Sequence, residues 1–338
     1  MKLKLMAVAI LAGCVTVPML GQSRPASLWQ GVNLRVNCGQ KVEGTLPTIN
    51  AALKLLSPAM SNTVTVSGTC NENVLIQGFD RLTLISTTGA TINDASGGQN
   101  SVVDIEDSRR VTLQGFTING GFGLGCGSAS VCYLTANTIQ FSSAQQGIGI
   151  SDGSRAYLTN NVIKNNSGRG LTINNGSQVF STTDTFQGNG DLGVAAGSGA
   201  FFVAVNSIIE DNGSDGVSAS DHSALRLISC TISGNTGNGV SLVHNSEARF
   251  DSNSGAATVS ANAGSGVLVK DLSFAFFGLG GNVTGNLGGT DVVCAPQFPA
   301  TRGALKNIGG GTTNCVEPQS PGPPQDVVPT RGVACEAK

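Results

Sequence analysis

The stretch Gln146-Gly147-Ile148-Gly149-Ile150 decides the fold, because versions of it return at a fixed interval along the chain. The pattern of a glycine followed by an apolar, a small and a second apolar residue occurs again at 169–173 and in the repeats beyond it. The leading glycines lie 23 residues apart four times in succession, and one more follows after 27: Gly147, Gly170, Gly193, Gly216, Gly239 and Gly266. Self-similarity at such a period indicates a solenoid in which each repeat stacks on the next.

Apolar residues alternate with polar or small residues inside each repeat, as in a strand with one buried face. Aligning the repeats gives four apolar columns that we expect to point inward. They are Ile148, Leu171, Val194, Val217, Val240 and Val267; Ile150, Ile173, Ala196, Ala219, Leu242 and Val269; Ile163, Phe186, Ile209 and Ile232; and Ala156, Val179, Phe202 and Leu225. The alternation therefore predicts an all-β solenoid of about ten coils, stacked roughly 4.8 Å apart.

A polar column accompanies the apolar ones: Asn166, Asn189, Asn212, Asn235, Asn262 and Asn286. Stacked side-chain amides can hydrogen-bond from coil to coil, and asparagine tolerates left-handed turn geometry. We interpret this column as a structural ladder and not as a site.

The composition agrees with a β fold in an oxidising compartment. There are 47 glycines, and charged residues make up only 12 % of the chain. The net charge is −2 and no basic stripe exists, which argues against a nucleic-acid partner.

Residues 1–21 have a short basic start and then an apolar run, the pattern of a signal peptide. Two processing schemes are open: cleavage after Gly21, or lipidation of Cys14 in the lipobox-like sequence at 11–14. The first predicts a secreted protein and the second a lipid-anchored protein of the cell envelope. No other stretch has the apolar length of a membrane span.

Eight cysteines remain once Cys14 is set aside, an even number that predicts disulfides in an exported protein. Spacing suggests three local pairs: Cys38 with Cys70, Cys126 with Cys132, and Cys294 with Cys315. Cys230 and Cys335 are left without an assigned partner. No C-x-x-C spacing is present, so we predict no metal site built on cysteine.

Both ends of a solenoid need covers. Residues 22–62 are expected to form the N-terminal cap, with a short amphipathic helix at 45–56 that has Thr45 as N-cap and Pro47 in its first turn. The β-helix is expected over 63–294, and an irregular Pro-rich segment over 295–338.

The Gly-apolar-x-apolar strand followed by an Asn-rich turn resembles the repeats of right-handed parallel β-helix proteins of the pectate-lyase-like superfamily. The resemblance covers about residues 63–294 and implies the fold. It implies little about activity, because the superfamily includes lyases, hydrolases, epimerases, adhesins and inert spacers. Enzymes with this fold use carboxylates, Arg or Lys on one outward face, sometimes with calcium; apart from that possible calcium, no cofactor is predicted.

Catalytic residues are hard to find by this comparison. The outward residues of the repeated strand are small and include no carboxylate: Gly149, Thr172, Ala195, Ser218 and Ser241. Thr183-Asp184 is only a fragment of a polygalacturonase-type motif. The candidates are Asp221, His222 and His244, because Asp221 and His244 are expected one coil apart and could form an acid–base pair or bind a metal. The alternative is that a turn requires polar residues there.

An outward aromatic row is the candidate for binding a ligand. If Ala156 points inward, then Tyr157, Phe180 and Phe201 point outward, with Arg155 and Arg226 close by. Aromatic rings can stack on sugars, and a row along the solenoid suits an extended polymer. The alternative is that the C-terminal segment covers the row.

The leading hypothesis from the sequence is thus an exported, non-catalytic β-helix protein that binds extracellular polysaccharide or has a surface-structural role. The alternative is a polysaccharide lyase, glycoside hydrolase or epimerase acting on a polyuronate or related glycan. The sequence leaves the oligomeric state open.

Overall fold

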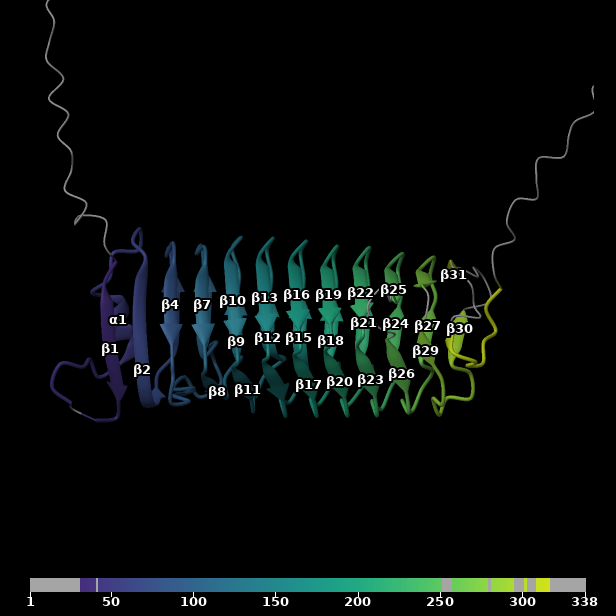
Figure 1. Cartoon of the computed structure of the whole chain (residues 1–338), viewed down its shortest axis with the longest axis horizontal. Coiled ribbons are helices and arrows are strands. Elements are labelled where there is room, and N and C mark those ends of the chain that lie inside the picture. The colour runs from purple at the N-terminus through teal and green to yellow at the C-terminus, as the bar shows by residue number, and fades with distance from the viewer. Residues whose placement is uncertain are drawn as a thin grey trace, which may run out of the picture. The chain divides into compact units, whose positions relative to one another are not determined.

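A computed structural model of the chain describes residues 31–40, 42–250, 257–278, 281–294, 301–302 and 308–316. These residues form a parallel β-helix in which successive coils contribute strands to three sheets (Figure 1). We call the sheets A, B and C. Strand β2 is long enough to belong to both A and B, and every strand pairing is parallel.

The strands of each sheet follow one another in chain order. Sheet A contains β1 (Asn33–Cys38), β2 (Asn62–Asn71), β4 (Leu82–Ile85), β7 (Val111–Gln114), β10 (Val131–Thr135), β13 (Arg155–Thr159), β16 (Gln178–Thr182), β19 (Phe201–Val205), β22 (Ala224–Ile228), β25 (Glu247–Phe250), β28 (Phe274–Phe277) and β31 (Thr301–Arg302). Sheet B contains the end of β2, β5 (Thr91–Asn93), β8 (Thr117–Asn119), β11 (Thr138–Gln140), β14 (Val162–Lys164), β17 (Thr185–Gln187), β20 (Ile208–Glu210), β23 (Thr231–Ser233), β26 (Thr258–Ser260) and β29 (Asn282–Val283). Sheet C contains β3 (Val74–Gln77), β6 (Val103–Glu106), β9 (Leu124–Cys126), β12 (Gln146–Ile150), β15 (Arg169–Ile173), β18 (Val194–Ala196), β21 (Val217–Ala219), β24 (Val240–Leu242), β27 (Val267–Val269) and β30 (Val292–Cys294).

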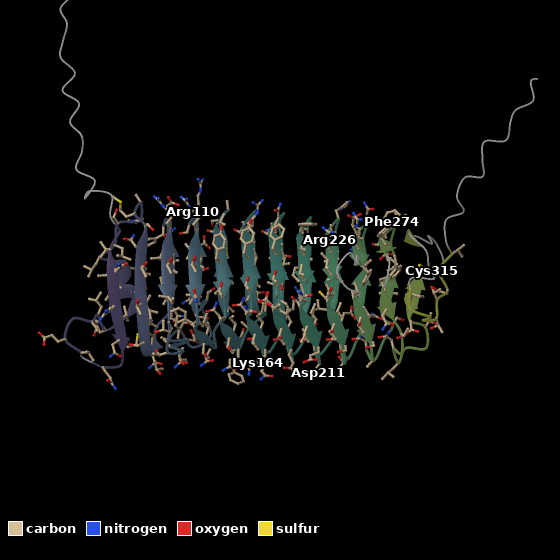
Figure 2. All side chains as sticks on the ribbon, viewed as in Figure 1. Arg110, Lys164, Asp211, Arg226, Phe274 and Cys315 are labelled. Atoms are coloured by element: carbon tan, nitrogen blue, oxygen red, sulfur yellow. A yellow bond between two sulfur atoms is a disulfide. The ribbon has the colours of Figure 1, made fainter. Side chains whose placement is uncertain are left out.

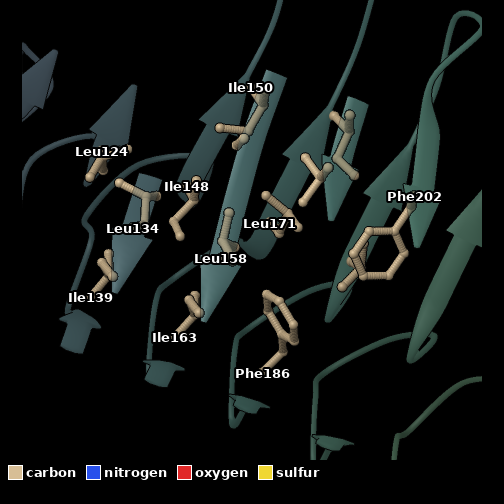
Figure 3. Close-up of a cluster of buried hydrophobic side chains, with 14 of the residues drawn as sticks. Leu124, Leu134, Ile139, Ile148, Ile150, Leu158, Ile163, Leu171, Phe186 and Phe202 are labelled. Carbon is tan, nitrogen blue, oxygen red and sulfur yellow. The ribbon is translucent and has the colours of Figure 1, made fainter. Parts of the chain in front are cut away.

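The register confirms the predicted inward columns. Ile148 pairs with Leu171 and Leu171 with Val194, and the same column continues to Val292 on β30. All of these side chains are buried, and Figure 3 shows residues from the three sheets, such as Leu124, Leu158 and Phe186, gathered in one interior. The ten strands of sheet C agree with the expected number of coils. Strand β26 pairs in register with β23 after the 27-residue repeat, of which residues 251–256 lie outside the described residues.

The asparagine column forms the predicted ladder. Each buried asparagine donates from Nδ2 to the Oδ1 of the next one, at 2.8–2.9 Å from Asn166 to Asn286. Each Nδ2 also donates to a backbone carbonyl, so that for Asn212 both amide hydrogens are used. At the last coil the carboxylate of Asp291 replaces the amide and accepts from Asn286.

Asp184, from the motif fragment Thr183-Asp184, belongs to a second, shorter ladder of hydrogen-bonded side chains. Asn137 donates to Asn161, and Asn161 donates to Asp184 from its backbone N–H and its Nδ2. Asp184 is completely buried, and burial raises the pKa of its carboxyl. The position of Asp184 is thus a structural one, inside the wall of the β-helix.

The three disulfides predicted from spacing are present. Cys38 is bonded to Cys70, Cys126 to Cys132, and Cys294 to Cys315. Cys230 is a free cysteine, and burial raises the pKa of its thiol to about 11. Cys335 lies outside the described residues.

The N-terminal helix is shorter than predicted. Helix α1 spans Ile49–Leu53, and its N-cap is Thr48, whose side chain accepts from the Ala51 N–H; the assignment of Thr45 as N-cap was wrong. The reason is tertiary: Leu46 forms a parallel bridge with Val36, which keeps the chain extended up to the cap.

A buried carboxylate completes this cap. Glu72, at the end of β2, accepts from the N–H groups of Ile49 at 2.7 Å and Asn50 at 3.0 Å. These are two of the amides that a helix leaves without an internal partner. Glu72 and the Cys38–Cys70 bond therefore hold the cap on the first coils.

The described residues cover the two termini only in part. The signal region at 1–21 and the Pro-rich residues from Pro318 onward lie outside the described residues. Within 295–338, β31 pairs with β28, and Thr313 bridges to Val292, so strand pairing continues past Cys294. Within the described ranges no helix has the length and apolar character of a membrane span.

Candidate functional site

The sequence-predicted polar cluster lies on the turns that connect sheet C to sheet A. His244 Nδ1 is 3.1 Å from Asp221 Oδ1, and His244 Nε2 is 3.9 Å from Asp271 Oδ2. The prediction that Asp221 and His244 lie one coil apart is confirmed. His222 is the next residue in the turn, and its N–H donates to the His244 carbonyl.

The same turns have a conformational reason for polar residues. The column of Asp152, Asn175, Ser198, Asp221, His244 and Asp271 has φ between 52° and 56° at every position. This left-handed region favours asparagine, aspartate and histidine over other non-glycine residues. More than half of the His244 side chain is exposed, as is that of Asp221. The geometry thus gives the cluster a turn-forming role.

The aromatic row lies on the outer face of sheet A. Tyr157 pairs in register with Phe180, and the row includes Tyr133 on the preceding coil, which the sequence analysis did not identify. Phe201 is in register with Gln178 rather than with Phe180, so it belongs to the neighbouring column. Arg155 lies in this neighbouring column and donates to Gln178 Oε1 at 2.8 Å and 3.1 Å.

The rings of this row stack mainly on one another. Tyr133 and Tyr157 are parallel within 9° with centroids 5.0 Å apart, and Tyr157 and Phe180 within 14° at 5.3 Å. Phe201 meets Phe180 edge-on at 71°. Since neighbouring rings occupy each other's faces, the row offers a ligand mostly ring edges and two tyrosine hydroxyls. Farther along the same sheet, Arg226 and Phe274 also project outward (Figure 2).

Replacing Tyr157 with alanine is expected to lower the free energy of unfolding by about 1–3 kcal/mol, because two cross-strand aromatic contacts are lost. Chemical denaturation measures the change. Thr159→Ala is the matched control, since it removes an outward side chain of the same strand without touching a ring. Equal stabilities of the two variants would contradict a stabilising role for the row.

A polar groove lies on the outer face of sheet C, near the N-terminal end. Its lining includes Ser101, Asp104, Glu106, Gln146, Thr172 and Asn174, with a volume of about 190 Å³. A neighbouring hollow of about 380 Å³ shares Ser101 and Asp104 and adds the exposed Leu75 and Phe122. We call the two hollows together the sheet C groove.

Glycines form the floor of this groove. Asp104 is in register with Gly125, Gly125 with Gly149, and Gly149 with Thr172, so three coil steps, roughly 14 Å, separate Asp104 from Thr172. A Cβ on Gly125 would clash with Asp104 Oδ1, and one on Gly149 would lie 2.8 Å from Gln146 Nε2. The Asp104 carboxylate and the Gln146 amide therefore lie directly over glycine backbone.

The two carboxylates of the groove have different surroundings. Asp104 is half-buried, and burial, together with the adjacent Glu106 carboxylate, raises the pKa of Asp104. Glu106 accepts a hydrogen bond from the Ser128 hydroxyl. No Lys, Arg or His occurs among the described residues that line the groove. Arg169 is in register with Gln146, but its Nε lies 3.3 Å from Asp191 Oδ2.

Asp104 and Glu106 were not predicted from the sequence, because they precede the regular repeat. The outward column was identified only from Gly149 onward, where its residues are small. The signal that could have found them is the alternation Val103-Asp104-Ile105-Glu106, which places both carboxylates on the outward face of one strand.

Comparison with known proteins agrees with this architecture. Residues 100–255 match the family model described as the right-handed beta helix region. The chain is similar in structure to the A-module of a mannuronan C-5 epimerase from Azotobacter vinelandii, with a TM-score of 0.50, 12 % identity, and coverage of 82 % of this chain and 86 % of that one. A mutant of a periplasmic alginate epimerase gives a TM-score of 0.53 at 13 % identity, with 80 % and 82 % covered.

A pectate lyase gives a TM-score of 0.44 at 13 % identity, covering 78 % of this chain and 74 % of that one. No curated protein sequence is significantly similar to the chain. At these identities the likeness concerns the fold, so the chemistry has to be argued from the side chains of the site.

Proposed function

Because the chain has the right-handed parallel β-helix fold of the pectate-lyase-like superfamily, we propose that it is an exported protein that binds an extracellular polysaccharide in the sheet C groove. The observation that carries the proposal is the groove itself, which crosses several coils and combines hydrogen-bonding side chains with exposed apolar ones. Export rests on the signal-like residues 1–21 and on the disulfides.

The chemistry of the lining suits a sugar polymer. Ser101, Gln146 and Asn174 offer donors and acceptors to hydroxyl groups. Leu75 and Phe122, with 52 % and 37 % of their surfaces exposed, offer apolar contact at the neighbouring end. A mixture of a few polar groups with apolar surface is typical of ligand sites. The two structural neighbours with TM-scores of 0.50 and 0.53 are named as epimerases of mannuronan and alginate, which supports a polysaccharide as the ligand class.

Two other surfaces named from the sequence stay predictions. The row of Arg155, Tyr157, Phe180 and Phe201 keeps ring edges and hydroxyls available for a glycan, as a second binding surface. The turn cluster of Asp221, His222 and His244 stays the alternative location for acid–base chemistry or for a metal.

Filling the groove tests the proposal. Gly149→Gln adds a long side chain on the outward face of β12. Its backbone lies outside the positive-φ region, and the first atom that the new Cβ would meet is the end of the flexible Gln146 side chain, which can move aside. Affinity electrophoresis through gels containing alginate, polygalacturonate, xylan, galactomannan or amylose measures binding. We expect at least one polymer to retard the protein, and Gly149→Gln to weaken that retardation by about tenfold or more, equivalent to about 1.4 kcal/mol.

Ser218→Gln is the matched control, because Ser218 lies in the same outward column, three coils beyond Gly149, and does not line the groove. Unchanged retardation in Gly149→Gln, or equal loss in both variants, would place binding elsewhere. Tyr157→Ala in the same gels reports on the aromatic row.

A further inference from the structure

We propose that Asp104 and Glu106 form an acid–base pair that hydrolyses glycosidic bonds of a neutral glycan lying in the sheet C groove. This inference rests on the proposed function, and it adds the reaction and the class of sugar. The expectation of a non-catalytic protein arose because the repeated strand lacks outward carboxylates. Strand β6 of the same sheet carries two.

The spacing of Asp104 and Glu106 along strand β6 suits a pair of catalytic groups. Residues two apart on a strand point to the same face, and their Cα atoms lie roughly 6.7 Å apart. Asp104 and Glu106 are so placed, and both side chains line the groove. Hydrolysis of a glycosidic bond is typically performed by two carboxyl groups that flank the bond. The strand thus presents two suitable carboxyl groups to the same groove.

The carboxyl groups of Asp104 and Glu106 differ in environment. Burial and the neighbouring charge raise the pKa of Asp104, which favours its protonated form as a proton donor. Glu106 accepts a hydrogen bond from the Ser128 hydroxyl, which fixes the orientation of the carboxylate assigned as the proton acceptor. Carboxyl groups whose surroundings differ in this way can take the roles of acid and base.

The charges that line the groove indicate the class of sugar. A lyase or epimerase that removes the proton beside a uronate carboxyl group has to stabilise the negative charge that develops, usually with a cation. Among the described lining residues there is no Lys, Arg or His, and the two carboxylates would repel a polyuronate. The charge pattern thus favours a neutral glycan and hydrolysis over a uronate and elimination.

The buried hydroxyl group of Thr172 offers a hydrogen bond to a ligand in the groove. The Thr172 side chain lines the groove and is only 5 % exposed, and its Oγ1 has no hydrogen-bond partner among the described residues. A buried polar group without a hydrogen-bond partner destabilises the folded protein. A sugar hydroxyl at this end of the groove would supply the missing partner.

The reaction balances with water as its only co-reactant. Asp104 donates its proton to the glycosidic oxygen, and the bond between this oxygen and the anomeric carbon breaks. A water molecule attacks the anomeric carbon, a new carbon–oxygen bond forms, and Glu106 accepts the proton that the water loses. Proton exchange with solvent then restores both carboxyl groups.

The experiment uses the full exported chain and the neutral polymer among xylan, galactomannan and amylose that retards it most. New reducing ends are measured for the wild type, Asp104→Asn and Glu106→Gln, with Glu210→Gln as a control on the outward face of sheet B. We expect turnover in the wild type and the control, and a loss of about 100-fold or more in each groove variant, with retardation by the polymer retained.

A role-specific readout separates catalysis from structure. A dinitrophenyl glycoside of the same sugar has a leaving group that needs no proton, so Asp104→Asn should retain most of its activity on this compound, whereas Glu106→Gln should not. Binding of the neutral polymer without new reducing ends would overturn the hydrolysis and leave the proposed function intact. Stronger retardation by alginate or polygalacturonate would overturn the neutral class, and no retardation by any polymer would overturn the proposed function together with this inference.

Discussion

Asn212→Ala is expected to lower the free energy of unfolding by about 3–5 kcal/mol, because it breaks the buried ladder at its centre. Asn212 Oδ1 accepts from the backbone N–H and the Nδ2 of Asn189, and its own Nδ2 donates to Asn235 and to the Phe186 carbonyl. The methyl group of alanine can make none of these bonds. All three asparagines are buried, so water cannot replace the lost partners without opening the wall.

Chemical denaturation and hydrogen exchange measure this effect. Exchange should accelerate first at the Asn189 and Asn212 amides, since each coil of a solenoid is stabilised by its immediate neighbours. Gln187→Ala is the matched control: it removes a primary amide from the outward face of β17, in the coil of Asn189. A change within about 0.5 kcal/mol is expected there. If the two variants were equally stable, the ladder would contribute nothing beyond the strands.

Removal of the Cys38–Cys70 disulfide, by alanine at both positions, is expected to cost about 3.5 kcal/mol on the chain-entropy account of cross-links. The bond closes a segment with a sequence separation of 32 and connects β1 to the end of β2. It also lies beside Glu72, whose carboxylate caps α1. Loss of the bond should therefore expose the amides of β1 and α1 to exchange before those of the central coils.

The Cys126–Cys132 disulfide provides the comparison. Its sequence separation is only 6, so the same account predicts a cost of about 2 kcal/mol for its removal. Denaturation of the two double variants, with correct pairing of the remaining disulfides verified by peptide mapping, tests the order. A larger cost for the Cys126–Cys132 variant would mean that local packing outweighs chain entropy.

The sequence predicted the regular coils because one rule governs all of them. The Gly-apolar-x-apolar pattern at 147–150 and its later copies places alternate side chains inside, and the period aligns them in columns. The asparagine ladder follows from the same period, because it depends on repetition along one chain. The three disulfides were predicted separately, from the short distances in sequence between their cysteines.

The first residue of α1 could not be predicted from the sequence. A bridge between Leu46 and Val36 keeps the chain extended where the helix was expected to begin. The position of Phe201 shows a different limit. The 23-residue period already aligns Phe201 with Gln178, and the pairing of β16 with β19 confirms this, but the sequence analysis grouped Phe201 with Tyr157 and Phe180 because all three point outward.

The sequence by itself determined the fold of this protein, because stacking the alternating repeats as coils buries all of the apolar columns together. Only the tertiary structure decided which residues line the sheet C groove. It brought Asp104 and Glu106, which precede the regular repeat, into one groove with Gln146 and Thr172 from later coils. The physical reason is that a groove is an absence of side chains: Gly125 and Gly149 leave the space, and strand register alone sets which neighbours surround it.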